Sequence, residues 1–187
     1  LSTIDYAKSV FDFISQHDDC IILVTDFKDF FENIDHNFLK SSLCRLLRRD
    51  VLPADFYAVF KNSTAYSYWD WENKKVCLQR NQSGKGIPQG SPLSAVLSNV
   101  YLSELDAKVS KKVSSVGGLY YRYCDDAIVV LPTKAKGLEK TMAIIEDVVN
   151  AFGSYPGVEV QREKTDFLRY EHIDGFGGIS KIDESGR

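Results

Sequence analysis

The sequence predicts an α+β domain of two layers, in which an antiparallel sheet carries helices on one face. Residues Cys20–Val24 form a short, entirely apolar run leading into Asp26, which is typical of a central buried strand. Residues Tyr120–Leu131 place Asp125 and Asp126 between two runs of β-branched and aromatic residues. This pattern predicts a β-hairpin with two carboxylates at its tip.

The composition suits one ordinary domain. The chain has 187 residues, 44% of them hydrophobic, and a formal net charge of −3. This charge argues against a free-standing nucleic-acid binder driven by basic charge, but it is compatible with an enzyme that has an acidic metal site. The four cysteines form no CxxC pair, which predicts free thiols in a reducing compartment. No signal peptide or membrane-spanning run is visible, so we expect a cytoplasmic protein.

Apolar residues at helical spacing predict the helices that connect the strands. These segments are residues 4–17, 37–49, 53–61, 92–112 and 133–152. Asp35 and Thr133 are the expected caps of the second and last of them. The helix over 92–112 has a nearly continuous small or apolar interior, so we expect it to be well buried.

The remaining segments predict hairpins and loops. Residues 65–80 are expected to form a hairpin that turns near Asn73, with aromatic side chains that either stack on single-stranded bases or pack across the strands. A Gly-rich loop follows over 81–90. Residues 158–161 are expected to form an edge strand, and residues 170–182 a hairpin that turns at Gly177-Gly178.

Three carboxylates are the candidate chemical centre. Two crossovers bring the strand that ends at Asp26 beside the hairpin that carries Asp125 and Asp126, so the three side chains are expected at one sheet edge. Their mutual repulsion is relieved by a divalent cation. Hard oxygen ligands favour Mg²⁺ or Mn²⁺, and a site with two such ions serves phosphoryl transfer.

Five motifs in order give the chain a family resemblance. They are Asp26–Phe31 (DFKDFF), Gly86–Ser94 (GIPQGSPLS), Tyr123–Asp126 (YCDD), Lys164-Thr165 and Phe176–Gly178 (FGG). Together they resemble the palm of a reverse transcriptase of the bacterial group II intron, retron and abortive-infection type. The resemblance covers nearly the whole chain and implies a ferredoxin-like antiparallel sheet.

The resemblance implies a role for each motif residue. Asp26 and Asp125 would bind two Mg²⁺ ions, or Mn²⁺, with Asp126 nearby and the Phe27 carbonyl completing one metal shell. Phe31 would be a steric gate against ribonucleotides. The implied contacts with the incoming nucleotide are Pro88, Gln89, Gly90 and Lys164, and those with the primer are Tyr123, Phe176, Gly177 and Gly178.

The resemblance also implies an activity and partners. The activity is RNA-directed DNA synthesis from deoxynucleotides on a DNA or RNA primer. The resemblance implies a single palm-centred domain over 1–187, in which residues 1–25 are expected to be a remnant of the fingers and the thumb is expected to be absent. Separate fingers and thumb regions, or a structured RNA, are therefore implied partners, and the chain alone is expected to be inactive if it lacks them.

Two departures leave the subtype open. Ser94-Ala95 and Cys124 differ from the residues usual in intron enzymes. Among the retroelement and antiviral-defence types of the family, these differences favour the defence-associated members. Template-independent DNA synthesis and a non-catalytic palm scaffold remain alternatives. A nucleotide cyclase fits less well, because the long Pro-Gln-Gly loop and helix suit a templated nucleotide pocket.

Overall fold

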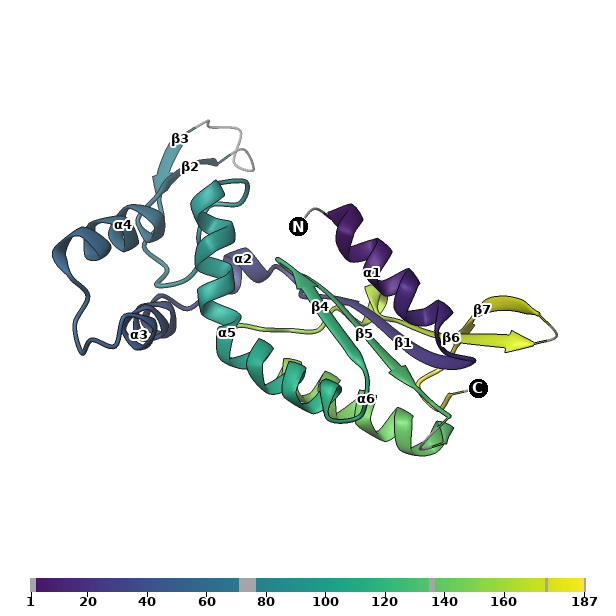
Figure 1. Cartoon of the computed structure of the whole chain (residues 1–187). Coiled ribbons are helices and arrows are strands. Elements are labelled where there is room, and N and C mark those ends of the chain that lie inside the picture. Colours follow the sequence, from purple (N-terminus) through teal and green to yellow (C-terminus); the bar gives the residue numbers. More distant parts are fainter. Residues whose placement is uncertain (1–2, 71–76, 135–136, 174, 187) are drawn as a thin grey trace. The chain divides into compact units, whose positions relative to one another are not determined.

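A computed structural model describes residues 3–70, 77–134, 137–173 and 175–186 (Figure 1). The chain forms two compact units. The first comprises residues 1–28, 105–155 and 159–187, and the second comprises residues 29–104 and 156–158. Helix α5 (Pro92–Ser114) begins in the second unit and ends in the first.

The first unit is built on a five-stranded antiparallel sheet, which confirms the predicted fold class. The strand order is β4-β5-β1-β6-β7. The strands are β1 (Asp19–Asp26), β4 (Leu119–Tyr123), β5 (Asp126–Pro132), β6 (Asp166–Ile173) and β7 (Phe176–Ile182). Helices α1 (Thr3–Ser15) and α6 (Leu138–Gly153) belong to the same unit.

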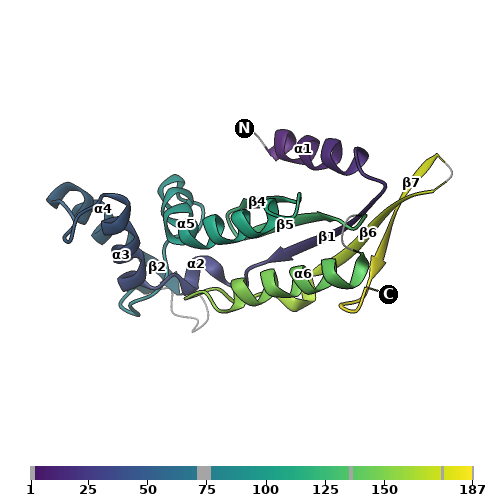
Figure 2. The same ribbon diagram turned by 60° about the horizontal axis from the view of Figure 1, so that its bottom comes forward.

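Helices cover both faces of this sheet, so the expectation of helices on one face was incomplete (Figure 2). Ile14 of α1 packs with Cys20, Ile22 and Val130 on one face. On the other face, the Phe152 ring of α6 lies 6.3 Å from that of Tyr120. The reason lies in β1, which is buried at every position from Cys20 to Leu23 and therefore needs apolar cover on both sides.

Thr133 does not cap α6, contrary to expectation. The helix begins at Leu138, with Gly137 at its N-cap. The Thr133 amide instead donates a hydrogen bond to the Asp19 carbonyl (3.1 Å), and its hydroxyl donates to the same oxygen (3.3 Å). Thr133 is thus used to fasten the end of β5 to the start of β1.

The C-terminal strands also differ from expectation. Residues 158–161 form no edge strand, since Val160 makes only a single bridge to Phe27 before the 3₁₀ turn η1 (Arg162–Lys164). The final hairpin begins earlier, at Asp166, and Gly177 lies within β7 rather than in the turn. A Cβ at Gly177 would lie 2.5 Å from the Tyr170 hydroxyl, so glycine makes room there for the Tyr170 ring.

The second unit holds the helices and the loop between the first two motifs. Its elements are α2 (Phe30–Asn33), α3 (His36–Leu46), α4 (Ala54–Thr64), β2 (Ser67–Asp70), β3 (Cys77–Arg80) and the first half of α5. Asp35 caps α3 as predicted, accepting from the Phe38 amide at 2.9 Å. The β2–β3 hairpin is confirmed, and its expected turn near Asn73 lies outside the described residues.

The expectation that α5 is well buried holds for only one of its faces. Tyr101 and Leu102 are fully buried, whereas Val96 is 57% exposed. The Tyr101 hydroxyl donates to the Pro156 carbonyl at 2.8 Å, which ties the short segment 156–158 into the second unit. Among the described residues, no helix is long and apolar enough to cross a membrane.

Gly118 offers a test of packing in the first unit. A Cβ there would lie 2.4 Å from Leu131 Cδ2 and 2.7 Å from the Val130 carbonyl oxygen. We expect Gly118→Ala to lower the free energy of unfolding by about 3 kcal/mol, because a backbone oxygen moves away less easily than a side chain. Gly117 has φ +75° and open space around it, so Gly117→Ala should cost only the backbone strain, about 1 kcal/mol. Urea denaturation measures the free energy of unfolding of both variants. Equal losses of stability would contradict the prediction that Gly118 is the more tightly packed position.

The Asp19–Arg169 pair makes stability depend on pH. Arg169 donates to both carboxylate oxygens of Asp19 at 3.1 and 2.7 Å. Burial raises the pKa of Asp19, but the hydrogen bonds from Arg169 and Thr133 outweigh it and the pKa is lowered. The stabilisation is therefore present above the unfolded pKa of about 3.9 and is lost as pH falls through the lower folded pKa.

Asp19→Asn should accordingly lower the free energy of unfolding at pH 7 by about 1 kcal/mol. The difference from the wild type should shrink as pH falls below about 4, since the wild-type carboxylate then becomes protonated. Denaturant unfolding at several pH values measures this. A wild-type advantage that is unchanged at the lowest pH would contradict the assignment.

Candidate active site

Two of the predicted carboxylates lie directly opposite each other. Asp26, the last residue of β1, pairs with Asp126, the first residue of β5, and Asp126 also pairs with Tyr123 of β4. Directly opposed residues point to the same face of a sheet with Cβ atoms about 5 Å apart. The side chains of Asp26, Asp126 and Tyr123 therefore lie on the face that α1 covers, where β1 and β4 end and β5 begins. We call this end of the sheet, together with Asp125, the carboxylate edge.

Asp125 is held beside them by a two-residue turn. Cys124 and Asp125 connect β4 to β5, and Cys124 adopts φ +54°. Tight hairpin turns demand a positive φ, which is costly for a residue with a Cβ. The Phe27 amide donates to the Asp125 carbonyl at 3.1 Å, which ties the turn to the residue that follows Asp26.

The electrostatics of this edge show concentrated negative charge. Desolvation raises the pKa of Asp126, and the neighbouring charges of Asp125 and Asp26 raise it further, with Lys164 acting in the opposite direction. The raised pKa means that ionising all three carboxylates is unfavourable here. A bound cation would relieve that repulsion.

Lys164 supplies one positive charge. Its Nζ lies 3.2 Å from Asp26 Oδ2, and its side chain is 59% exposed against 18% for Asp26. The η1 turn is anchored to β1, because the Gln161 amide donates to the Asp26 carbonyl (2.9 Å) and the Lys164 amide donates to the Gln161 carbonyl (3.0 Å). The Thr165 hydroxyl also donates to the Gln161 carbonyl (2.9 Å). The sequence did not predict the hydrogen bond between Gln161 and Asp26, because the two residues are far apart in the chain.

The donor chemistry of these residues fits a hard divalent cation. Carboxylate oxygens are the ligands that Mg²⁺ and Mn²⁺ prefer, and the repulsion at Asp126 is of the kind that such an ion relieves. Within the part of the chain that the structure describes, no three His, Cys, Asp or Glu side chains already form a metal-holding cluster. In this arrangement Lys164 provides the counter-charge next to Asp26.

In the second unit, the loop of the second motif is fastened to the end of the first motif. The Ile87 amide donates to the Phe31 carbonyl (2.9 Å), and the Gly86 amide donates to the Ile34 carbonyl (2.8 Å). His36 Nε2 donates to the Gly86 carbonyl at 2.7 Å. These bonds hold Phe31 next to the loop.

The tip of this loop is open to solvent. Gln89 and Gly90 are exposed, and Gly90 has φ +82°, a conformation that favours glycine. The Ser94 hydroxyl donates to the Pro88 carbonyl at 2.6 Å, which fixes the loop to the first turn of α5. In the second unit, these hydrogen bonds therefore keep Phe31 close to the loop that carries Pro88, Gln89 and Gly90.

Comparison with protein families decides the classification. The family model described as "Reverse transcriptase (RNA-dependent DNA polymerase)" matches residues 2–178. The chain belongs to the reverse transcriptase family. The predicted family resemblance is thus confirmed at the level of the family.

Solved structures agree with this classification in their fold. A C-terminally truncated apo telomerase from Candida tropicalis matches with a TM-score of 0.65 at 17% identity, covering 97% of this chain and 40% of that one. A Candida albicans telomerase in complex with a TWJ fragment of telomeric RNA matches with a TM-score of 0.58 at 14% identity, covering 98% and 34%. This reverse transcriptase chain therefore spans less than half the length of these telomerases. A comparison with curated protein sequences gave no significant match.

Not all predicted site residues of this reverse transcriptase lie at the carboxylate edge. Gly178 of β7 pairs with Glu171, which in turn pairs with Asp19 at the start of β1, whereas the carboxylates lie at its end. The segment Phe176–Gly178 therefore lies at the opposite end of the sheet. The side chain of Phe176 is 82% exposed there.

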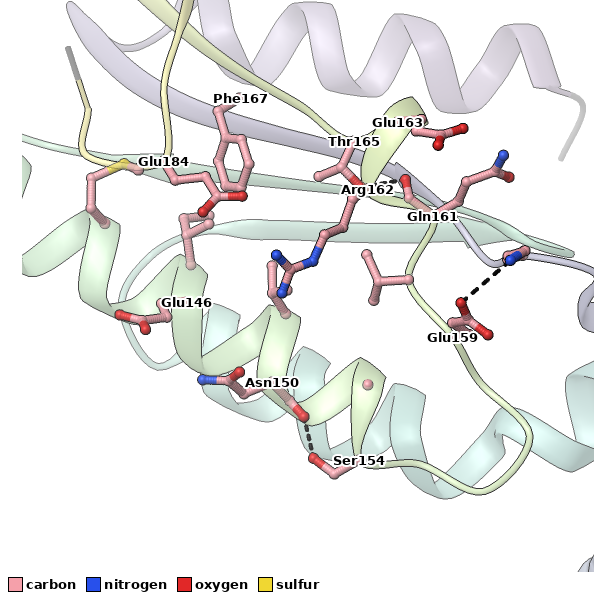
Figure 3. A pocket seen from close by; sticks show the side chains of 16 residues that line it. Glu146, Asn150, Ser154, Glu159, Gln161, Arg162, Glu163, Thr165, Phe167 and Glu184 are labelled. Atoms are coloured by element: carbon pink, nitrogen blue, oxygen red, sulfur yellow. Dashed lines mark hydrogen bonds and ion pairs between the residues drawn. The ribbon is translucent and has the colours of Figure 1, made fainter.

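A large pocket lies on the other face of the sheet (Figure 3). Its volume is about 1030 Å³, and it is lined by α6, residues 159–163, Thr165 and Phe167. Phe167 pairs with Leu23, so it points away from the face that Asp26 shares with Asp126. None of the three carboxylates lines this pocket, which is therefore separate from the candidate active site.

Proposed function

We propose that this chain carries the catalytic palm of an RNA-directed DNA polymerase, which adds deoxynucleotides to a primer 3′-OH. The observation that carries the proposal is the cross-strand pair of Asp26 and Asp126, with Asp125 tied beside them, in a chain of the reverse transcriptase family. Three neighbouring carboxylates support a mechanism of phosphoryl transfer assisted by divalent metal ions.

Each residue at this edge has a chemical role in the proposal. Asp26, Asp125, Asp126 and the Phe27 carbonyl would hold two Mg²⁺ ions, or Mn²⁺, which polarise the attacking and leaving oxygens when bound. The ammonium of Lys164, already 3.2 Å from Asp26, would donate hydrogen bonds to the triphosphate and offset negative charge that develops on the leaving pyrophosphate.

The proposal also assigns substrate contacts. Phe31, Pro88, Gln89 and Gly90 would contact the incoming deoxynucleotide, since loop bonds hold them as one segment. Tyr123, which shares the face of Asp26, would contact the primer end, and Phe176, Gly177 and Gly178 would contact the primer farther from the carboxylates. The RNA template, the bacterial subtype and a cytoplasmic location are parts of the same proposal.

Primer extension on an RNA template of mixed sequence tests this function. The intact protein is incubated with a labelled primer, Mg²⁺ and all four deoxynucleotides, and the products are sequenced. We expect products complementary to the template. Products that ignore the template would instead indicate template-independent synthesis, and a folded protein that incorporates nothing under these conditions would favour the scaffold alternative.

A further inference from the structure

Arg122 of β4 is a buried charge with an unusually complete set of partners. Its side chain is only 4% exposed. Nε and Nη2 donate to the two carboxylate oxygens of Asp106 at 2.9 and 2.7 Å. Burying a guanidinium costs several kcal/mol unless its donors are satisfied, so such a pair fixes the position of the group within narrow limits.

The third contact of Arg122 points to a role beyond the ion pair. Nη1 donates to the main-chain carbonyl of Cys124 at 2.7 Å. Cys124 is the turn residue with φ +54°, and its carbonyl belongs to the peptide bond that leads into Asp125. Rotation of this peptide plane would change ψ of Cys124 and φ of Asp125, and it would therefore redirect the Asp125 carboxylate.

The turn is held from both sides. Arg122 binds the Cys124 carbonyl, and the Phe27 amide binds the next carbonyl along the chain, that of Asp125. Because Asp106 accepts from the Nε–Nη2 edge of the guanidinium, Arg122 cannot swing away without breaking this bidentate pair. Two consecutive peptide planes at the tip of the hairpin are thereby fixed in orientation.

We propose that Arg122 is a positioning residue for Asp125: locked by Asp106, it holds the Cys124–Asp125 peptide so that the Asp125 carboxylate faces the reacting groups. The inference rests on the proposed polymerase function and adds to it a residue that contacts neither metal nor nucleotide. Its action passes through the main chain of the turn.

Tyr120 provides the matched control for a purely structural role. Its hydroxyl donates to Asp106 Oδ1 at 2.7 Å, so Tyr120→Phe weakens the support of the same carboxylate without touching the turn. Arg122→Lys keeps a positive charge beside Asp106, but a single ammonium cannot reproduce the planar fork that reaches both Asp106 and the Cys124 carbonyl.

The test combines kinetics with amide hydrogen exchange on the intact protein. For Arg122→Lys we expect kcat for deoxynucleotide addition to fall about 30-fold while KM changes less than about twofold, since the lost interaction acts in the transition state. Exchange should accelerate at the Phe27 amide, which is bonded to the turn, and remain slow at Leu23 and Val129 in the core strands. Tyr120→Phe should leave kcat and the exchange of Phe27 close to wild type.

The outcomes separate this inference from the function on which it rests. Arg122→Lys with wild-type kcat, or with faster exchange throughout the sheet, would overturn the positioning role. If the wild-type protein incorporates no nucleotide, the proposed function fails. Faster exchange confined to Phe27 and the turn would then still support control of the turn by Arg122, and unchanged exchange would refute it.

Discussion

Asp125→Asn in the intact protein should reduce the rate of deoxynucleotide addition by about 1,000-fold or more, because metal-assisted charge stabilisation is worth several kcal/mol and each 1.36 kcal/mol is tenfold in rate. Folding should survive. The bond from the Phe27 amide goes to the main-chain carbonyl of Asp125, which the substitution leaves in place. Single-turnover primer extension measures the rate, and thermal unfolding measures the fold.

Asp12→Asn is the control for this loss. Asp12 is an exposed residue of α1, so its replacement removes the same formal charge away from the carboxylate edge. We expect its activity to equal that of the wild type. Comparable activity in Asp125→Asn would show that the carboxylate edge is not the site of nucleotide addition.

Phe31→Ala should change the choice of sugar. If the Phe31 ring blocks a ribose 2′-OH, its removal should raise the kcat/KM for ribonucleotides relative to deoxynucleotides by about 100-fold, the range that steric discrimination in a pocket reaches. The loop should stay in place, because Ile87 is bonded to the Phe31 carbonyl and not to its ring. Paired measurements with a ribonucleotide and its deoxynucleotide give the ratio.

Phe31→Tyr serves as the comparison, since it keeps an aromatic ring of similar size at the same position. Its preference for deoxynucleotides should stay near that of the wild type. If Phe31→Ala discriminates against ribonucleotides as strongly as Phe31→Tyr, Phe31 is not the steric gate. The loop at Gln89 would then be the next candidate.

The central strand and the hairpin were predictable because local pattern determines them. The apolar run before Asp26 and the paired aromatic and β-branched runs around Asp125 match β1, β4 and β5. The cover of both sheet faces was not predicted, although a strand apolar at consecutive positions carries that information. Gly177 was read as a turn residue, whereas its small size is required by a ring from the neighbouring strand.

The positions of the acids in the sheet were predictable, but the contacts around them were not. Asp26 and Asp126 follow from strand ends and motif spacing. By contrast, Arg122, Asp106 and the Gln161 anchor of Lys164 act through contacts between residues that are distant in the chain or through main-chain atoms. A single sequence carries no signal for such contacts, because any surface arginine or glutamine presents the same local pattern.

Binding of Mn²⁺ followed by calorimetry tests the metal site most directly. The intact wild type is titrated with and without saturating dTTP, and the heat of Mn²⁺ binding to the nucleotide alone is subtracted. We expect binding by the wild type and by Asp12→Asn that strengthens with dTTP, and its loss in folded Asp125→Asn. Equal Mn²⁺ binding by the wild type and Asp125→Asn, with and without dTTP, would contradict the assignment of the carboxylate edge as the catalytic metal site.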